Sequence, residues 1–128
     1  MPTIVCSAIL LQKGLTLAKQ IQSRTLIIYQ DATGHEPFAE WLEGLRDPLI
    51  KRRILIRLRR VEQGNYGDYK ALKDGIYELR LQFGAGYRVY FGEDNDTIVI
   101  LLLGGDKSSQ DKDIEQAKIY WMEYKHHA

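Results

Sequence analysis

The sequence predicts a small α+β domain built on a twisted, mainly antiparallel sheet. The main signal is the stretch Gly75–Gly105, in which three strand-like segments are separated by turn residues. A short β-branched run, Thr25–Gln30, precedes two helical segments, and a third helical segment follows the strands. We therefore expect about four strands, with two helices before the three consecutive strands and one after them.

The three consecutive segments differ in the spacing of their apolar residues. Ile76–Phe83 and Tyr87–Gly92 alternate apolar and polar side chains, which is typical of strands with one buried face. Thr97–Leu103 is apolar at nearly every position, so we expect it to be the central strand, buried on both faces.

The turn between the first two of these strands decides which polar side chains meet. If Gly84–Gly86 is a three-residue loop, Arg80 lies opposite Tyr90. Arg80 and Arg88 are then diagonal neighbours on the polar face, about 7–8 Å apart. Two such arginines repel each other unless an anion lies nearby, either the carboxylate of Glu78 or a bound phosphate. An ordinary solvated sheet face is an equally weighted interpretation.

Each helical segment carries one apolar stripe. Pro37 suits the first position of the first helix, and the second covers Leu49–Gln63. The third covers Asp111–Tyr124. Ser108, just before it, and Asp111, three residues further on, have the spacing of a capping box.

The second helix is also strongly basic, with only Glu62 as an acidic residue. Its cations are Lys51, Arg52, Arg53, Arg57, Arg59 and Arg60. Such a surface is usually a solvated helix face, and here a surface for RNA or for an acidic partner is comparably supported.

Further cations lie in loops. Lys70 and Lys73 are interleaved with tyrosines in Gly64–Asp74, a pattern that suits base stacking and phosphate contact, although ordinary loop packing is favoured. Lys107 follows two glycines at a strand-to-helix junction, where backbone N–H groups can hold an anion.

Length and composition fit one domain with a separate extension. The chain has 128 residues and a net charge of +1, so any basic function must be local. We expect residues 1–24 to be a poorly tied extension and residues 25–128 to form the domain. A single cysteine, Cys6, and the lack of a long apolar run fit a cytoplasmic protein that does not enter a membrane. The histidines indicate no metal site.

Several motifs in this order resemble the RelE/ParE toxin superfamily over about residues 25–124. They are EWLEGL, GDYKALKDGIYELRL, GYRVYF and GGDKSSQDKDIEQA. The resemblance is greatest to the addiction-module killer proteins, a branch that includes HigB-like and phage Gp49-like members. It implies a RelE-like fold and the role of toxin in a type II toxin–antitoxin pair.

The resemblance also implies partners. The cognate antitoxin would be a small helix-turn-helix protein encoded nearby, and RelE-like members cleave mRNA on the ribosome without a cofactor. ParE-like members instead inhibit DNA gyrase by protein contact. Three functions therefore stay open: an mRNA endonuclease, which we favour, a gyrase inhibitor, and a non-catalytic binding module. The sequence leaves a homodimer open as well.

By resemblance, Arg88 matches an arginine that contacts the scissile phosphate in RelE. Arg80 matches a basic residue on the first strand of the RelE hairpin, and Lys107 matches a lysine at the sheet-to-helix junction. Three other family positions depart from the RelE pattern, because they hold Glu78, Ser108 and Ile114 instead of a lysine, an arginine and a tyrosine. The RelE acid–base set is therefore not reproduced.

The expected catalytic residues are those of the polar strand face. Arg80 and Arg88 would neutralise the phosphate, Glu78 would act as base, and Tyr90 would orient a base or leaving group. The expected RNA-binding residues around them are Lys107, Lys70, Lys73, Arg52, Arg53 and Arg57.

Overall fold

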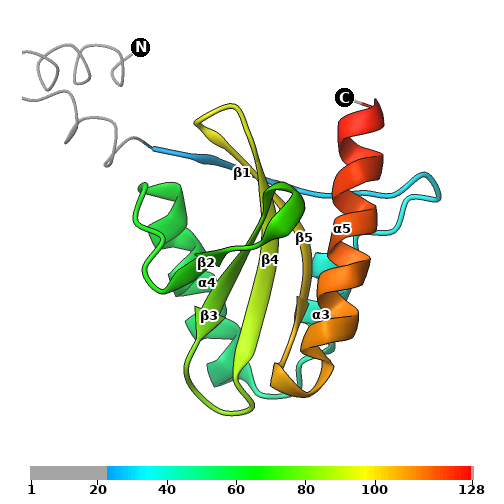
Figure 1. The fold of residues 1–128 in the computed structure, drawn as a ribbon. Helices are drawn as coiled ribbons and strands as arrows, with labels where there is room; N and C mark the ends of the chain where they lie inside the picture. Colours follow the sequence, from blue (N-terminus) through cyan, green and yellow to red (C-terminus); the bar gives the residue numbers. More distant parts are fainter. Residues whose placement is uncertain (1–22, 128) are drawn as a thin grey trace, which may run out of the picture.

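The structure is a computed structural model that describes residues 23–127, and its centre is a five-stranded sheet with helices on both faces (Figure 1). The strands are β1 (Thr25–Ile28), β2 (Tyr69–Ala71), β3 (Ile76–Leu81), β4 (Tyr87–Asp94) and β5 (Ile98–Gly105). The main helices are α3 (Pro37–Gly44), α4 (Pro48–Glu62) and α5 (Gln110–His127), and short 3₁₀ turns cover Lys73–Gly75 and Lys107–Ser109. The predicted α+β class and helix order are confirmed.

The strand order is β1-β5-β4-β3-β2, and only β1 runs parallel to its neighbour. The segment expected to be the central strand is β5, which is largely buried and lies between β1 and β4. The middle strand of the five is β4 instead. The sequence missed β2, which lies inside the expected loop Gly64–Asp74. Its three residues are all exposed, so they show no alternation that could have revealed a strand.

The predicted hairpin register is wrong by two residues. Arg80 lies directly opposite Arg88, and Glu78 lies opposite Tyr90. The connection therefore spans residues 82–86, with Gly84 and Gly86 in the left-handed region at φ 57° and 73°. Both registers place the apolar side chains on one face, because a shift by two residues preserves alternation, so the pattern alone could not separate them.

The two faces of the sheet carry separate cores. α3 and α4 cover one face, where Phe38, Ile54 and Leu58 pack against strand residues such as Leu79 and Val89. α5 lies on the other face, where Ala117 and Trp121 pack against Tyr90, Ile100 and Leu102. The apolar stripes expected for all three helices are thus the faces that the helices bury.

The helix starts differ in one respect from the expectation. Asp47 caps α4, since its carboxylate accepts a hydrogen bond of 2.9 Å from the Leu49 N–H. The expected capping box of Ser108 and Asp111 is wrong. Asp106 is the acceptor there, for the backbone N–H and the hydroxyl of Ser108, because a 3₁₀ turn precedes α5.

Most of the expected extension, residues 1–22, lies outside the described residues. Arg24, at its end, is tied to the domain: its N–H donates to the Glu62 carbonyl at 2.7 Å and its Nε to the Tyr66 hydroxyl at 3.1 Å. No described helix is long and apolar enough to cross a membrane.

Gly104 offers a test of how closely α3 packs on the sheet. A Cβ added at this position would lie 2.1 Å from Cε3 of Trp41. We expect Gly104→Ala to lower the free energy of unfolding by about 1–3 kcal/mol, because the indole must move. Gly44→Ala is the control, since a Cβ there meets nothing within 4 Å. Urea unfolding measures both, and equal stability of the two variants would contradict the close packing.

Candidate functional site

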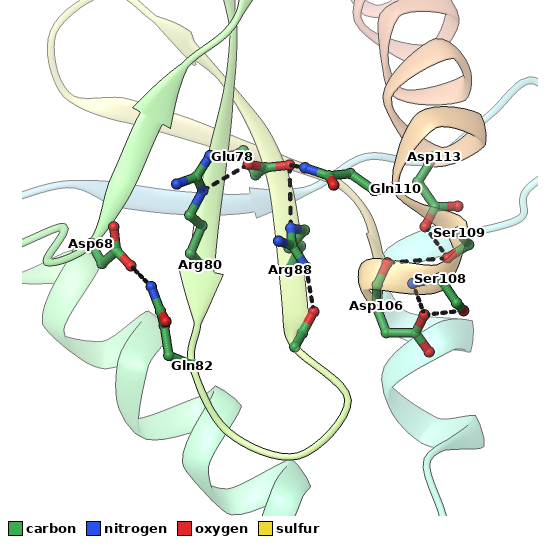
Figure 2. Close-up of polar contacts among 11 residues, drawn as sticks. Asp68, Glu78, Arg80, Gln82, Arg88, Asp106, Ser108, Ser109, Gln110 and Asp113 are labelled. Atoms are coloured by element: carbon green, nitrogen blue, oxygen red, sulfur yellow. Dashed lines mark hydrogen bonds and ion pairs between the residues drawn. The ribbon is translucent and has the colours of Figure 1, made fainter.

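The candidate site lies on the face of β3 and β4 that α5 only partly covers (Figure 1). Alternation along the strands places Glu78, Arg80 and Arg88 on this face, and the register sets the two arginines opposite each other. Figure 2 shows the arginine side chains on neighbouring strands, with Glu78 between them and Gln110 of α5. The polar strip expected from the sequence therefore exists, in a tighter arrangement.

Glu78 is the centre of this arrangement. It is 0% exposed, and it is the one charged residue among the described residues that is fully buried. One carboxylate oxygen accepts a hydrogen bond of 3.0 Å from Arg80 Nε, and the other accepts one of 2.9 Å from Gln110 Nε2. Arg88 Nε lies 3.5 Å from the second oxygen. The carboxylate thus binds two strands and the start of a helix together.

The protonation of Glu78 follows from these partners. Burial by itself raises the pKa of the carboxyl group, but the hydrogen bonds from Gln110 and Arg80 and the charge of Arg80 favour the ionised form and lower the pKa overall. Glu78 is therefore a carboxylate at neutral pH. It compensates the two arginines, as expected from the sequence.

The arginines differ in their access to solvent. The Arg80 side chain is 33% exposed and the Arg88 side chain 14%. Arg88 also donates a 2.7 Å hydrogen bond from Nη1 to the Gly86 carbonyl, which holds its guanidinium near the hairpin loop. Arg80 is thus held by Glu78, and Arg88 by Glu78 and the Gly86 carbonyl, while both side chains still reach the surface.

A pocket of about 170 Å³ opens beside them. Its lining consists of Arg80, Leu81, Gln82, Gly86, Tyr87, Arg88 and Lys107. Three of these residues are cationic and none is acidic, because Glu78 lies beneath the arginines, outside the lining. The pocket can accept an anion about the size of one phosphate group.

Tyr90, expected to orient a base or leaving group, is fully buried. Its hydroxyl makes no hydrogen bond with any described residue, and the same is true of Arg88 Nε, which keeps only its ion pair with Glu78. Burial and the negative field of Glu78 raise the pKa of Tyr90. Because neither Glu78 nor Tyr90 reaches the pocket surface, neither is placed to touch a substrate there.

Two of the expected lysines belong to the same face as the pocket. Lys107 lines the pocket directly. Lys70, on β2, lies opposite Glu78 in the strand register, so its side chain emerges on the face of the arginines. Lys73 lies in the 3₁₀ turn before β3 and is not part of the lining.

The expected α4 arginines lie on the opposite side of the sheet. Arg57 is anchored to the protein itself, with donors to the carbonyls of Tyr66, Asp68 and Arg80 at 2.7–3.2 Å. Burial lowers its pKa. Arg53 stacks over the Phe83 ring at 5.1 Å, and Arg52 is exposed on the helix. The structure therefore does not bring these three arginines to the pocket.

Sequence reasoning missed five residues of the site: Leu81, Gln82, Gly86, Tyr87 and Gln110. The first four line the pocket from the end of β3, the hairpin loop and the start of β4. Gln110 and Glu78 are 32 residues apart in the sequence, and no local sequence pattern predicts a contact over that distance.

The buried carboxylate predicts a pH-dependent stability. Glu78→Gln leaves two arginines without a counter-charge, so we expect a loss of about 2 kcal/mol in unfolding free energy at pH 7. Because the folded pKa of Glu78 is lowered, its stabilisation is complete above the unfolded value of about 4.3 and disappears as pH falls through the folded value. The difference between wild type and variant should therefore shrink below about pH 4.

Urea unfolding from pH 7 to pH 3 measures this difference. Glu115→Gln is the control, because this carboxylate is exposed and its ion pair with Lys118 is at the surface. A Glu78→Gln protein as stable as the control variant at pH 7 would show that the buried ion pairs contribute nothing.

Comparison with known proteins supports a family assignment. The chain is 52% identical over 82 residues to an uncharacterized protein of Haemophilus influenzae. The aligned region covers 64% of this chain and 83% of the relative. The sequence model of the family described as "Phage derived protein Gp49-like" matches residues 40–121, which include α4, the hairpin, the pocket and most of α5. This family is of the toxin–antitoxin, RelE-like type. The chain belongs to the Gp49-like family of phage-derived proteins.

Proposed function

We propose that this chain is the toxin of a type II toxin–antitoxin pair and acts in the cytoplasm as a ribosome-dependent mRNA endonuclease. The observation that carries the proposal is the pocket lined by Arg80, Arg88 and Lys107 and by no carboxylate. A pocket of this size and charge suits one backbone phosphate of an RNA strand. The antitoxin, mRNA and ribosome are the partners.

The arginines would act on the phosphate. In RNA cleavage the ribose 2′-hydroxyl loses its proton to a base or to water, and its oxygen forms a bond to the adjacent phosphorus. The bond from that phosphorus to the 5′-oxygen breaks, and the 5′-oxygen takes up a proton. Negative charge accumulates on the phosphate oxygens in the transition state, where fixed cations are most effective. Glu78, whose carboxylate also accepts a hydrogen bond from Gln110, holds the two guanidinium groups in place before the substrate arrives.

The roles of Glu78 and Tyr90 change in this proposal. Their burial makes Glu78 a positioning residue for the arginines, and leaves Tyr90 in the packing behind it. The uncharged polar side chains in the lining are Gln82 and Tyr87, and Gln82 is held by a 2.8 Å hydrogen bond to Asp68. Tyr87 is the residue we assign to contact with the ribose or the leaving group.

The same burial favours a second candidate function. A pocket whose lining contains no carboxylate or histidine lacks the usual groups for proton transfer. Inhibition of DNA gyrase by protein contact would not need them. A non-catalytic binding module would not need them either.

The pocket cations provide the direct test. We expect Arg80→Ala and Arg88→Lys to reduce cleavage about 10²–10³-fold, because each removes a fixed, two-pronged phosphate contact. Lys107→Ala should reduce it less, about tenfold, because an exposed lysine contributes a mobile charge. The measurement is the rate of mRNA cleavage on programmed ribosomes.

Lys112→Ala is the matched control, an exposed lysine of α5 outside the pocket lining. Thermal unfolding of each variant separates loss of activity from loss of fold. Cleavage at the wild-type rate by well-folded Arg80→Ala and Arg88→Lys proteins would remove the pocket from the mechanism.

Induced expression without an antitoxin separates the two toxin mechanisms. We expect growth arrest in which protein synthesis stops before DNA replication, since mRNA is the proposed substrate. Pulse labelling with an amino acid and with thymidine measures the order, and plasmid supercoiling is followed in parallel. Early loss of supercoiling with intact mRNA would favour the gyrase mechanism instead.

A further inference from the structure

The outward face of α4 carries a second concentration of positive charge, apart from the pocket. We call it the outer stripe, and it consists of Leu49, Arg52, Arg53, Ile56, Arg59 and Arg60. These positions follow the spacing i, i+3, i+4, i+7, i+10 and i+11, which places them along one side of a helix. The buried residues Ile54, Leu58 and Val61 lie on the opposite side.

Two large apolar side chains are exposed within this stripe. Leu49 is 55% exposed and Ile56 is 47% exposed, although both stand among arginines. They are one helical spacing of seven residues apart, so they lie in line along the axis. A solvated helix face gains nothing from such residues, whereas a partner that covers them removes their apolar area from water, and arginine is enriched in protein interfaces.

The charge of the stripe indicates the kind of partner. Its four arginines form no ion pair with any of residues 23–127, and the stripe contains no acidic residue. The stacking of Arg53 on Phe83 keeps one guanidinium against the surface beside the hairpin loop. A complementary segment would therefore carry carboxylates around a few apolar residues.

We propose that the outer stripe is the docking surface for an acidic, amphipathic helix of the antitoxin. The stripe from Leu49 to Arg60 is about 17 Å long at 1.5 Å per residue, so a partner helix of about 12 residues covers it. Family membership supplies the existence of an antitoxin, and the proposal does not depend on RNA cleavage.

Two other occupants fit the stripe less well. An RNA backbone would pair with the arginines but would gain nothing from Leu49 and Ile56, because phosphate contacts are electrostatic. Residues 1–22 of this chain contain Lys13 and Lys19 and no aspartate or glutamate, so they would bring more positive charge to the stripe.

The experiment uses the full chain and the purified product of the reading frame adjacent to its gene. Calorimetric titration gives the affinity, and gel filtration of the chain alone gives its oligomeric state. We expect Leu49→Ser and Ile56→Ser each to weaken binding at least about tenfold. Ile119→Ser on α5 is the matched control, because Ile119 is 49% exposed and lies outside the stripe. It should bind as the wild type does.

Arg59→Gln and Arg60→Gln should slow association at low salt, and the effect should fade at about 0.5 M salt. Cleavage of mRNA by the Leu49→Ser and Ile56→Ser proteins should be unchanged, which separates this surface from the pocket. Circular dichroism checks that every variant is folded.

Four results would overturn the proposal. The first is that the adjacent protein does not bind the wild-type chain, and the second is that both serine variants bind it as well as the wild type does. The third is that the chain dimerises through Leu49 and Ile56. The fourth is that the serine variants bind the adjacent protein normally but bind a 20-nucleotide single-stranded RNA more weakly than the wild type does. The last would assign the stripe to RNA.

Discussion

The site depends on one buried carboxylate. Glu78 is removed from water, so it needs partners of opposite charge, and Arg80 and Arg88 need a negative charge because they face each other across two strands. The arginines supply the positive charge that Glu78 needs, and Glu78 supplies the negative charge that the arginines need. Gln110 supplies the remaining contact and ties the start of α5 to the sheet. The position of the cations, the register of the hairpin and the docking of the last helix are therefore one connected arrangement.

Two groups of basic residues lie on opposite sides of the sheet. Arg80, Arg88 and Lys107 surround a pocket on the α5 face, whereas the arginines of the outer stripe lie beyond α4 on the other side. A net charge of +1 conceals this separation, because the acidic residues are distributed elsewhere. Two surfaces with different shapes and different apolar content can serve two partners at the same time. In our proposals a nucleic acid occupies the pocket and a protein occupies the outer stripe.

The sequence predicted which residues share a face of the sheet. It did not predict the register of the hairpin or which residues of that face are buried. Alternation assigns Glu78, Arg80 and Arg88 to one side of the hairpin, and it survives in the structure because the period of a strand is two. The same period hides a shift of two residues, so Arg88 was paired with the wrong neighbour. The burial of Glu78 and Tyr90 could not be predicted either. It depends on where α5 lies, and that is decided by contacts between residues far apart in the chain.

The topology of the sheet has a consequence for synthesis of the chain. β1 lies beside β5, and Thr25 pairs with Ile98, so the first strand has no neighbour until nearly the whole sheet has been translated. Gln110, which fixes Glu78, comes later still. The nascent chain therefore exposes the arginine pair before its counter-charge is locked in place, and the pocket takes its final form only after the start of α5 has left the ribosome. A chain that ends before Gln110 lacks the contact that ties Glu78 to the start of α5.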